Sequence, residues 1–99
     1  MLFRSQALVF KVMGKMFALL APDNLPPTLS LKCDPTEALM LRERYVAVRP
    51  GYHMNKKHWN TVTLDGSVPG DEIRTMIDAS YALVVQGLKK ADREKLATL

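Results

Sequence analysis

Hydrophobic and polar residues alternate over short runs near the start of the chain, which is the pattern of β-strands. Residues 7–13 and 15–21 are rich in Val, Leu and Phe, and Gly14 with Lys15 supplies a tight turn between them. These features predict a β-hairpin. Residues 28–33 alternate Leu with Ser and Lys and predict a third strand, which follows a loop rich in proline.

Two later segments show helical spacing. Asp34 is placed to cap a helix, Pro35 suits its first position, and Glu37 stands where a capping box has its second partner. This helix is expected to reach about Tyr45. A second helix is expected to begin near Pro69 and to pack one face on a sheet. The residues that share this face are Ile73, Met76, Ile77, Ser80, Tyr81, Val84 and Leu88.

Residues 46–49 and 59–64 again favour strands, and each run is followed by a turn sequence that contains glycine. The elements therefore follow the order β-β-β-α-β-β-α. Such an order predicts an α+β fold, a two-layer sandwich in which helices pack on an antiparallel sheet. The 99 residues are expected to form a single domain.

The excess of basic residues is concentrated in one segment. The chain has a net charge of +4, and residues 42–60 contain five basic residues and one acidic residue, so this segment accounts for the whole excess. A local basic patch points to an anionic partner. The chain has one cysteine, which allows no internal disulfide, and no apolar run long enough to span a bilayer, so a cytoplasmic location is expected.

The basic segment overlaps a run of mixed chemistry at residues 50–61, where aromatic rings, cations and amides stand close together. Surfaces that bind nucleic acid combine these groups, because cations contact phosphates, rings stack on bases and amides hydrogen-bond to either. The sequence therefore predicts weak, salt-sensitive binding of DNA. The candidate contact residues are Arg42, Arg44, Arg49, Tyr52, His53, Asn55, Lys56, Lys57, His58, Trp59 and Asn60.

Other roles for these residues stay open. The same surface could form a pocket for a small anionic molecule or for an acidic peptide of a partner protein, and Trp59 could instead anchor the core. His53 and His58 lack the further ligands of a zinc site, so no metal is expected. No nucleophile with an adjacent base can be identified, and Cys33 is expected to be a buried structural thiol. The sequence thus predicts a non-enzymatic protein without a cofactor.

The segments described above resemble the MmcQ/YjbR family of small bacterial proteins. The resemblance extends over residues 9–88, and residues 51–61 are its most specific part. Other matching segments are residues 9–12, 14–19, 31–35, 64–66 and 76–78. The resemblance implies a two-layer fold of order α-β(3)-α-β(2)-α, similar to secretion chaperones, and a role in binding DNA.

The chain departs from that family at its start. Residues 1–5 read as foreign sequence, and the first helix of the family fold has no counterpart, so we expect this helix to be missing. The apolar residues that it would cover are then expected to be partly exposed, which would cause self-association or marginal stability. These residues are Leu8, Phe10, Val12, Phe17 and Leu19.

Overall fold

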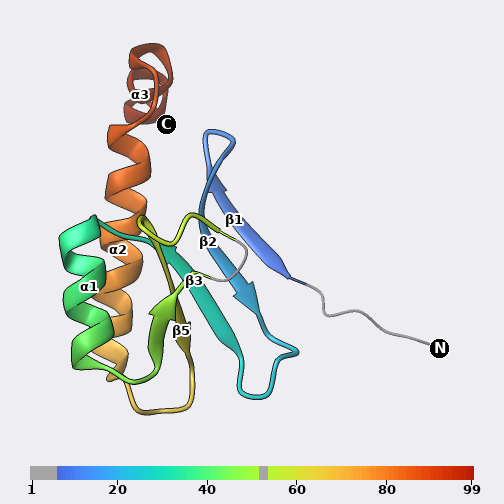
Figure 1. The fold of residues 1–99 in the computed structure, drawn as a ribbon. Coiled ribbons are helices and arrows are strands. Elements are labelled where there is room, and N and C mark those ends of the chain that lie inside the picture. The colour runs from blue at the N-terminus through green and yellow to red at the C-terminus, as the bar shows by residue number, and fades with distance from the viewer. Residues whose placement is uncertain (1–6, 52–53) are drawn as a thin grey trace.

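Antiparallel strands form one sheet, and helices cover one of its faces (Figure 1). The computed structural model describes residues 7–51 and 54–99. Within them the elements are β1 (Leu8–Val12), β2 (Lys15–Ala21), β3 (Thr28–Lys32), α1 (Pro35–Arg44), β4 (Val48–Pro50), β5 (Trp59–Thr63), α2 (Gly70–Gln86) and α3 (Lys90–Ala97). The strand order is β1-β2-β3-β5-β4. The predicted α+β fold, with two layers and an antiparallel sheet, is confirmed, whereas α3 was not predicted.

The hairpin of β1 and β2 turns one residue earlier than the sequence indicated, at Met13 and Gly14. Both residues have a positive φ, 48° for Met13 and 80° for Gly14. Glycine adopts this conformation without steric cost, and it matches the twist of the strands in a two-residue hairpin. The predicted hairpin is therefore correct, and only the turn position differs.

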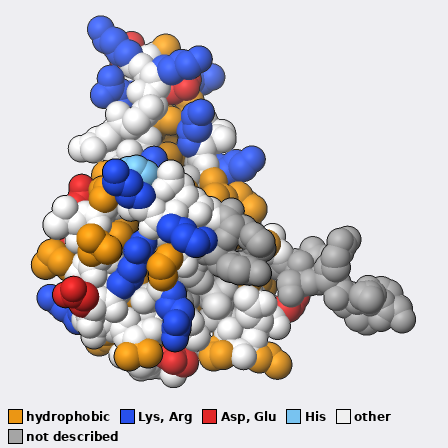
Figure 2. Space-filling view, viewed as in Figure 1, with side chains coloured by type: hydrophobic (Ala, Val, Ile, Leu, Met, Phe, Trp, Pro, Cys, Tyr) orange, Lys and Arg blue, Asp and Glu red, His pale blue; other side chains and the backbone are white. Residues whose placement is uncertain are grey.

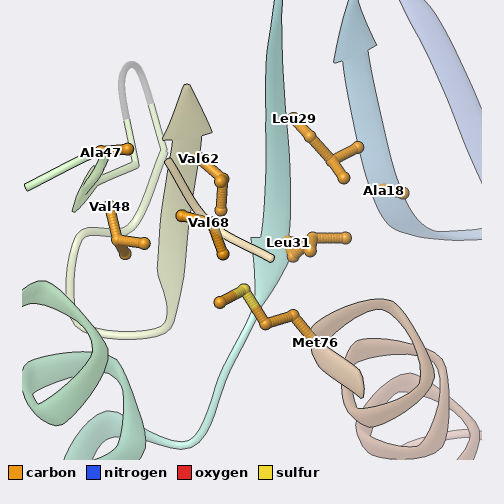
Figure 3. Close-up of a cluster of buried hydrophobic side chains, with 8 residues drawn as sticks. All are labelled: Ala18, Leu29, Leu31, Ala47, Val48, Val62, Val68 and Met76. Atoms are coloured by element: carbon orange, nitrogen blue, oxygen red, sulfur yellow. The ribbon is translucent and has the colours of Figure 1, made fainter. Parts of the chain in front are cut away.

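The core lies between the helices and the central strands. Leu29 pairs with Val62 and Leu31 pairs with Asn60 across β3 and β5, so these side chains share the helix-covered face of the sheet. Figure 3 shows Met76 reaching from α2 toward this buried cluster. Burial of these apolar groups is the main favourable contribution to folding. The register also fixes Asn60 on the core face, which matters for the candidate site.

The start of α1 follows the predicted capping chemistry. The Asp34 carboxylate accepts hydrogen bonds from the backbone N–H groups of Thr36, at 3.1 Å, and Glu37, at 3.3 Å. These bonds satisfy donors that have no partner within the first turn of a helix. The helix ends before Tyr45, whose N–H donates to the Leu41 carbonyl at 2.9 Å. Both predicted ends of α1 are confirmed.

A serine of α2 joins two strands. Ser80 is fully buried, its hydroxyl donates to the Phe17 carbonyl at 2.6 Å, and it accepts from the Lys32 N–H at 2.9 Å. The hydroxyl thus bridges β2 and β3 just beyond their last paired residues. The Phe17 and Tyr81 rings meet edge to face nearby, with centroids 5.1 Å apart. The predicted packing of this helix face on the sheet is confirmed, except that α2 ends at Gln86, so the buried Leu88 lies beyond it.

The first strand is only partly covered. α2 packs mainly on β2 and β3, and α1 packs on β4, so β1 lies at the margin of the helical layer. Leu8 and Val9 are each 47% exposed and Phe10 is 44% exposed. The expectation of exposed apolar residues is thus correct for Leu8 and Phe10. It is wrong for Val12, which is 7% exposed.

We expect the chain to self-associate through this edge strand, because a second copy can pair with the outer side of β1 and cover its apolar side chains. Sedimentation should give a mass above 11.1 kDa that rises with concentration. Val9→Lys should lower this mass. Val46→Lys is the matched control, because Val46 is even more exposed, at 85%, but lies just before β4, at the opposite edge of the sheet from β1. A monomer at every concentration would contradict this prediction.

Candidate nucleic-acid interface

The loop between β4 and β5 begins at a point of very close backbone approach. The Gly51 N–H donates to the Trp59 carbonyl at 2.8 Å. A Cβ at Gly51 would lie 2.8 Å from the Trp59 Cβ, which is closer than such atoms approach one another. Glycine is therefore required here for steric reasons. At this position, the distinctive segment of residues 51–61 determines the path of the backbone.

The far end of the loop is a compact turn built on Asn55. The Asn55 side-chain oxygen accepts from the Lys57 N–H at 2.9 Å, and its carbonyl accepts from the N–H groups of His58, at 3.2 Å, and Trp59, at 2.9 Å. Asparagine favours such turns because its side chain can satisfy a nearby backbone donor. The His58 carbonyl also accepts from the Cys33 N–H at 2.7 Å. This bond fastens the turn to the end of β3.

Arg42 of α1 joins the helix to this loop. Its Nε donates to the Asn60 side-chain oxygen at 2.7 Å, and its terminal nitrogen donates to the Lys56 carbonyl and, at 3.4 Å, to the Trp59 carbonyl. The Asn60 amide nitrogen in turn donates to the Ala38 carbonyl at 3.4 Å. The planar guanidinium suits this role because it presents several donors in fixed directions.

These bonds change the roles expected for two of the predicted contact residues. Asn60 is only 3% exposed, so its expected place on the surface is corrected: its amide is turned inward and is occupied by Arg42 and Ala38. Arg42 is half-buried, and its guanidinium is largely occupied by the loop. Both residues position the loop rather than project from it.

The remaining cations do not form one continuous patch. Lys56 and Lys57 are exposed on the loop, and the Lys56 ammonium lies 3.3 Å from the Gly51 carbonyl. Arg49 pairs with Thr61 and points to the sheet face opposite the core, because its neighbour Val48 is buried. Arg44 lies at the end of α1, with its guanidinium carbon 6.0 Å from the Tyr45 ring centre.

The other predicted site residues divide into three groups. Tyr52 and His53 lie outside the described residues. His58 and Trp59 are half-buried, so neither presents a fully exposed ring, while Asn55 is exposed. Across residues 7–51 and 54–99, no group of three or more His, Cys, Asp or Glu residues is arranged to hold a metal ion. In the same residues, no helix is long and apolar enough to cross a membrane.

Sequence reasoning missed a pocket of about 190 Å³ between α1 and α2. Of the predicted residues that the structure describes, only Arg44 and Asn60 line it. Its other walls come from β3, β5 and the facing sides of the two helices. No local pattern marks such a pocket, because its residues are distant in sequence and each has an ordinary role in its own element.

Cys33 stands at this pocket and has perturbed acidity. Burial raises the pKa of its thiol, the carboxylates of Glu37 and Asp34 raise it further, and the Arg42 cation opposes them. The thiol is therefore protonated at neutral pH. Cys33 is half-buried, so the expectation of a buried thiol is corrected.

Comparison with known proteins connects this fold to one family. The YjbR family model matches residues 1–83. The uncharacterized protein YbdF of Escherichia coli O157:H7 is 42% identical over 93 residues, which cover 89% of this chain and 72% of that protein. The uncharacterized protein YjbR of Escherichia coli K12 is 40% identical over 94 residues, which cover 95% of this chain and 80% of that protein.

Solved structures give the same relationship. The crystal structure of a Deinococcus radiodurans protein matches with a TM-score of 0.87 and 44% identity, covering 96% of this chain and 73% of that chain. A crystal structure of a Pseudomonas syringae protein matches with a TM-score of 0.69 and 32% identity, covering 78% of this chain and 75% of that chain. Sequence and fold therefore point to the same family.

Replacing Arg42 should destabilise the protein far more than replacing an exposed arginine. Arg42→Met keeps the apolar stem but leaves the Asn60 oxygen and the Lys56 carbonyl without their donor, so the free energy of unfolding should fall by about 1.5–3 kcal/mol. Arg49→Met, on the open sheet face, should change it by no more than about 0.5 kcal/mol. Urea unfolding monitored by circular dichroism measures both. Equal losses would show that Arg42 has no special role.

The pKa of Cys33 should respond to the charge of Glu37. Glu37→Gln removes a negative neighbour, so the pKa should fall and the rate of iodoacetamide alkylation should increase at any pH below it. The pH–rate profile should shift toward lower pH. Glu43→Gln, on the same helix and also exposed, removes a carboxylate that does not shift the Cys33 pKa and should leave the profile in place. Coincident profiles for wild type and Glu37→Gln would contradict the assignment.

Proposed function

This chain belongs to the YjbR family, and we propose that it binds the DNA backbone weakly and without reading base sequence. The contact surface is the turn at residues 54–58, with Lys56 and Lys57 as its phosphate-binding cations. The observation that carries this proposal is that Arg42 and Asn55 fix the backbone of the turn from inside and leave both lysine side chains exposed. The proposed role is binding, without catalysis.

A hollow lies beside the turn. Lys57 and Arg42 line a hollow of about 170 Å³ beside the start of α1, together with Pro35, Thr36 and Leu39. The exposed lining of this hollow is mainly apolar and the Arg42 guanidinium is already bonded to the loop, so Lys57 is the cation that a phosphate oxygen would meet here. Figure 2 shows further Lys and Arg side chains spread over this face and over α3, with few acidic side chains among them.

The same geometry argues against sequence-specific recognition. Asn60, which could have read base edges, is buried, and the Asn55 oxygen is occupied by the backbone of its own turn. Phosphate contacts set affinity and orientation but carry no sequence information. Arg44 and Arg49 point elsewhere, so a single duplex would meet few cations. Few phosphate contacts give weak binding that salt readily weakens further.

Removing both lysines of the turn should weaken DNA binding and its salt dependence together. Each phosphate contact contributes a slope of about 0.9 in the plot of log binding constant against log salt concentration, so Lys56→Gln/Lys57→Gln should flatten this slope by about 1.8. The loss should be similar for duplexes of different sequence. Fluorescence anisotropy with labelled duplexes at several salt concentrations measures both quantities.

The control for this experiment is Lys11→Gln/Lys15→Gln, which removes the same charge from exposed lysines of the β1–β2 hairpin. This variant should retain the parent slope. The proposal fails if the parent protein does not bind duplex DNA at low salt. It also fails if the two double variants lose the same amount of DNA affinity. In the second case, net charge rather than the turn would govern binding.

A further inference from the structure

The pocket between α1 and α2 has an apolar floor that belongs to the core. Leu31, Val62 and Met76 line it and are 2%, 0% and 8% exposed, and Figure 3 shows these side chains turned toward the same space beside α2. The space exists because α1 packs on β4 while α2 packs mainly on β2 and β3. The two helices therefore pack on different parts of the sheet. Well-formed apolar pockets with a few polar groups at the rim are the usual sites of small ligands.

The rim carries balanced charge. Glu37 and Arg44 reach it from α1, Glu72 from α2 and Lys32 from the end of β3, which gives two groups of each sign. A strongly anionic or cationic ligand would be attracted by the two groups of opposite charge and repelled by the two groups of like charge. The Cys33 thiol stands at the same rim as a neutral hydrogen-bond donor. These features favour a neutral ligand with a polar group at one end.

The volume limits the size of the ligand. A cavity of about 150 Å³ lined by apolar side chains holds one benzene molecule, and this pocket has about 190 Å³. We propose that the pocket binds a small neutral molecule with one ring-sized apolar body and one polar group. The apolar body lies on Leu41, Met76 and Ala79, above the buried Leu31 and Val62, and the polar group meets Cys33 and the rim. Neither Lys56 nor Lys57 lines the pocket, so this site is separate from the proposed DNA surface.

Disulfide exchange at Cys33 can test the pocket without a known ligand. The intact protein is equilibrated with the symmetric disulfides of N-benzoyl-, N-acetyl- and N-succinyl-cysteamine in excess 2-mercaptoethanol. The Cys33 thiolate attacks one sulfur of the probe, a mixed disulfide forms, and the other half leaves as a thiol. Intact mass then gives the yield of each conjugate. All three probes share one exchange chemistry, so differences in yield report non-covalent contacts of the acyl group.

The benzoyl conjugate should exceed the acetyl conjugate by about tenfold, the effect expected from burying a modest apolar area. The succinyl conjugate should not exceed the acetyl one, because its charge is not favoured at the rim. Ala79→Leu should bring the ratio of benzoyl to acetyl yield close to one, because this residue lines the pocket and a larger side chain would fill it. Ala82→Leu, at another exposed alanine of α2 that does not line the pocket, should retain the wild-type ratio.

The ratio is the decisive quantity, because changes in the exposure or pKa of Cys33 affect both conjugates equally. Equal yields for the three probes with wild-type protein would overturn the proposal. A benzoyl preference that survives Ala79→Leu, or that both leucine variants abolish equally, would also overturn it. Loss of the preference in Ala79→Leu alone supports a ring-sized pocket at this place.

Discussion

The candidate DNA-binding surface depends on the hydrogen bonds that the Arg42 guanidinium donates. The loop between β4 and β5 leaves the sheet ladder and therefore has carbonyl groups that need other donors. Arg42 supplies them from α1, to Lys56 and Trp59, and also holds the buried oxygen of Asn60. An ammonium group at this position would be a flexible point charge and could not reproduce the fixed fork of donors. The outward direction of Lys56 and Lys57 follows from this inward anchoring of their backbone.

Ser80 imposes a second constraint, on the opposite side of the core. Its hydroxyl replaces the direct bond that β2 and β3 would otherwise make beyond Ala18 and Leu31, and so it fixes where these strands begin to separate. It also holds α2 over β2 and β3, away from α1. The two helices are thus anchored to different parts of one sheet, α1 through Arg42 and α2 through Ser80. The pocket between them is a consequence of these two anchors.

Features that depend on neighbours in sequence could be predicted, and features that depend on distant partners could not. The Asp34 cap, the strand after the proline-rich loop and the inward face of α2 arise from local geometry, and all three are confirmed, although Ser30 of β3 is buried together with Leu29 and Leu31. β4 begins at Val48 rather than at residue 46, because the preceding residues turn after α1, with the Val48 N–H donating to the Tyr45 carbonyl at 3.1 Å. The burial of Asn60 depends on its register against Leu31 and on Arg42, eighteen positions away. A polar residue in an alternating strand gives no sign of such a partner.

Basic residues that are close together in the sequence do not form one patch on the folded protein. The basic side chains of residues 42–60 point in different directions in the structure. Arg42 turns inward, Arg49 points to the open sheet face and Arg44 lies at the rim of the pocket. What remains on the turn is a pair of lysines. Arg42 nevertheless links the two proposed sites, because it holds the loop, orients the Asn60 amide at the pocket wall and lowers the pKa of Cys33. Any contact that displaced Arg42 would loosen the lysine-bearing turn, release the Asn60 oxygen and raise the pKa of that thiol together.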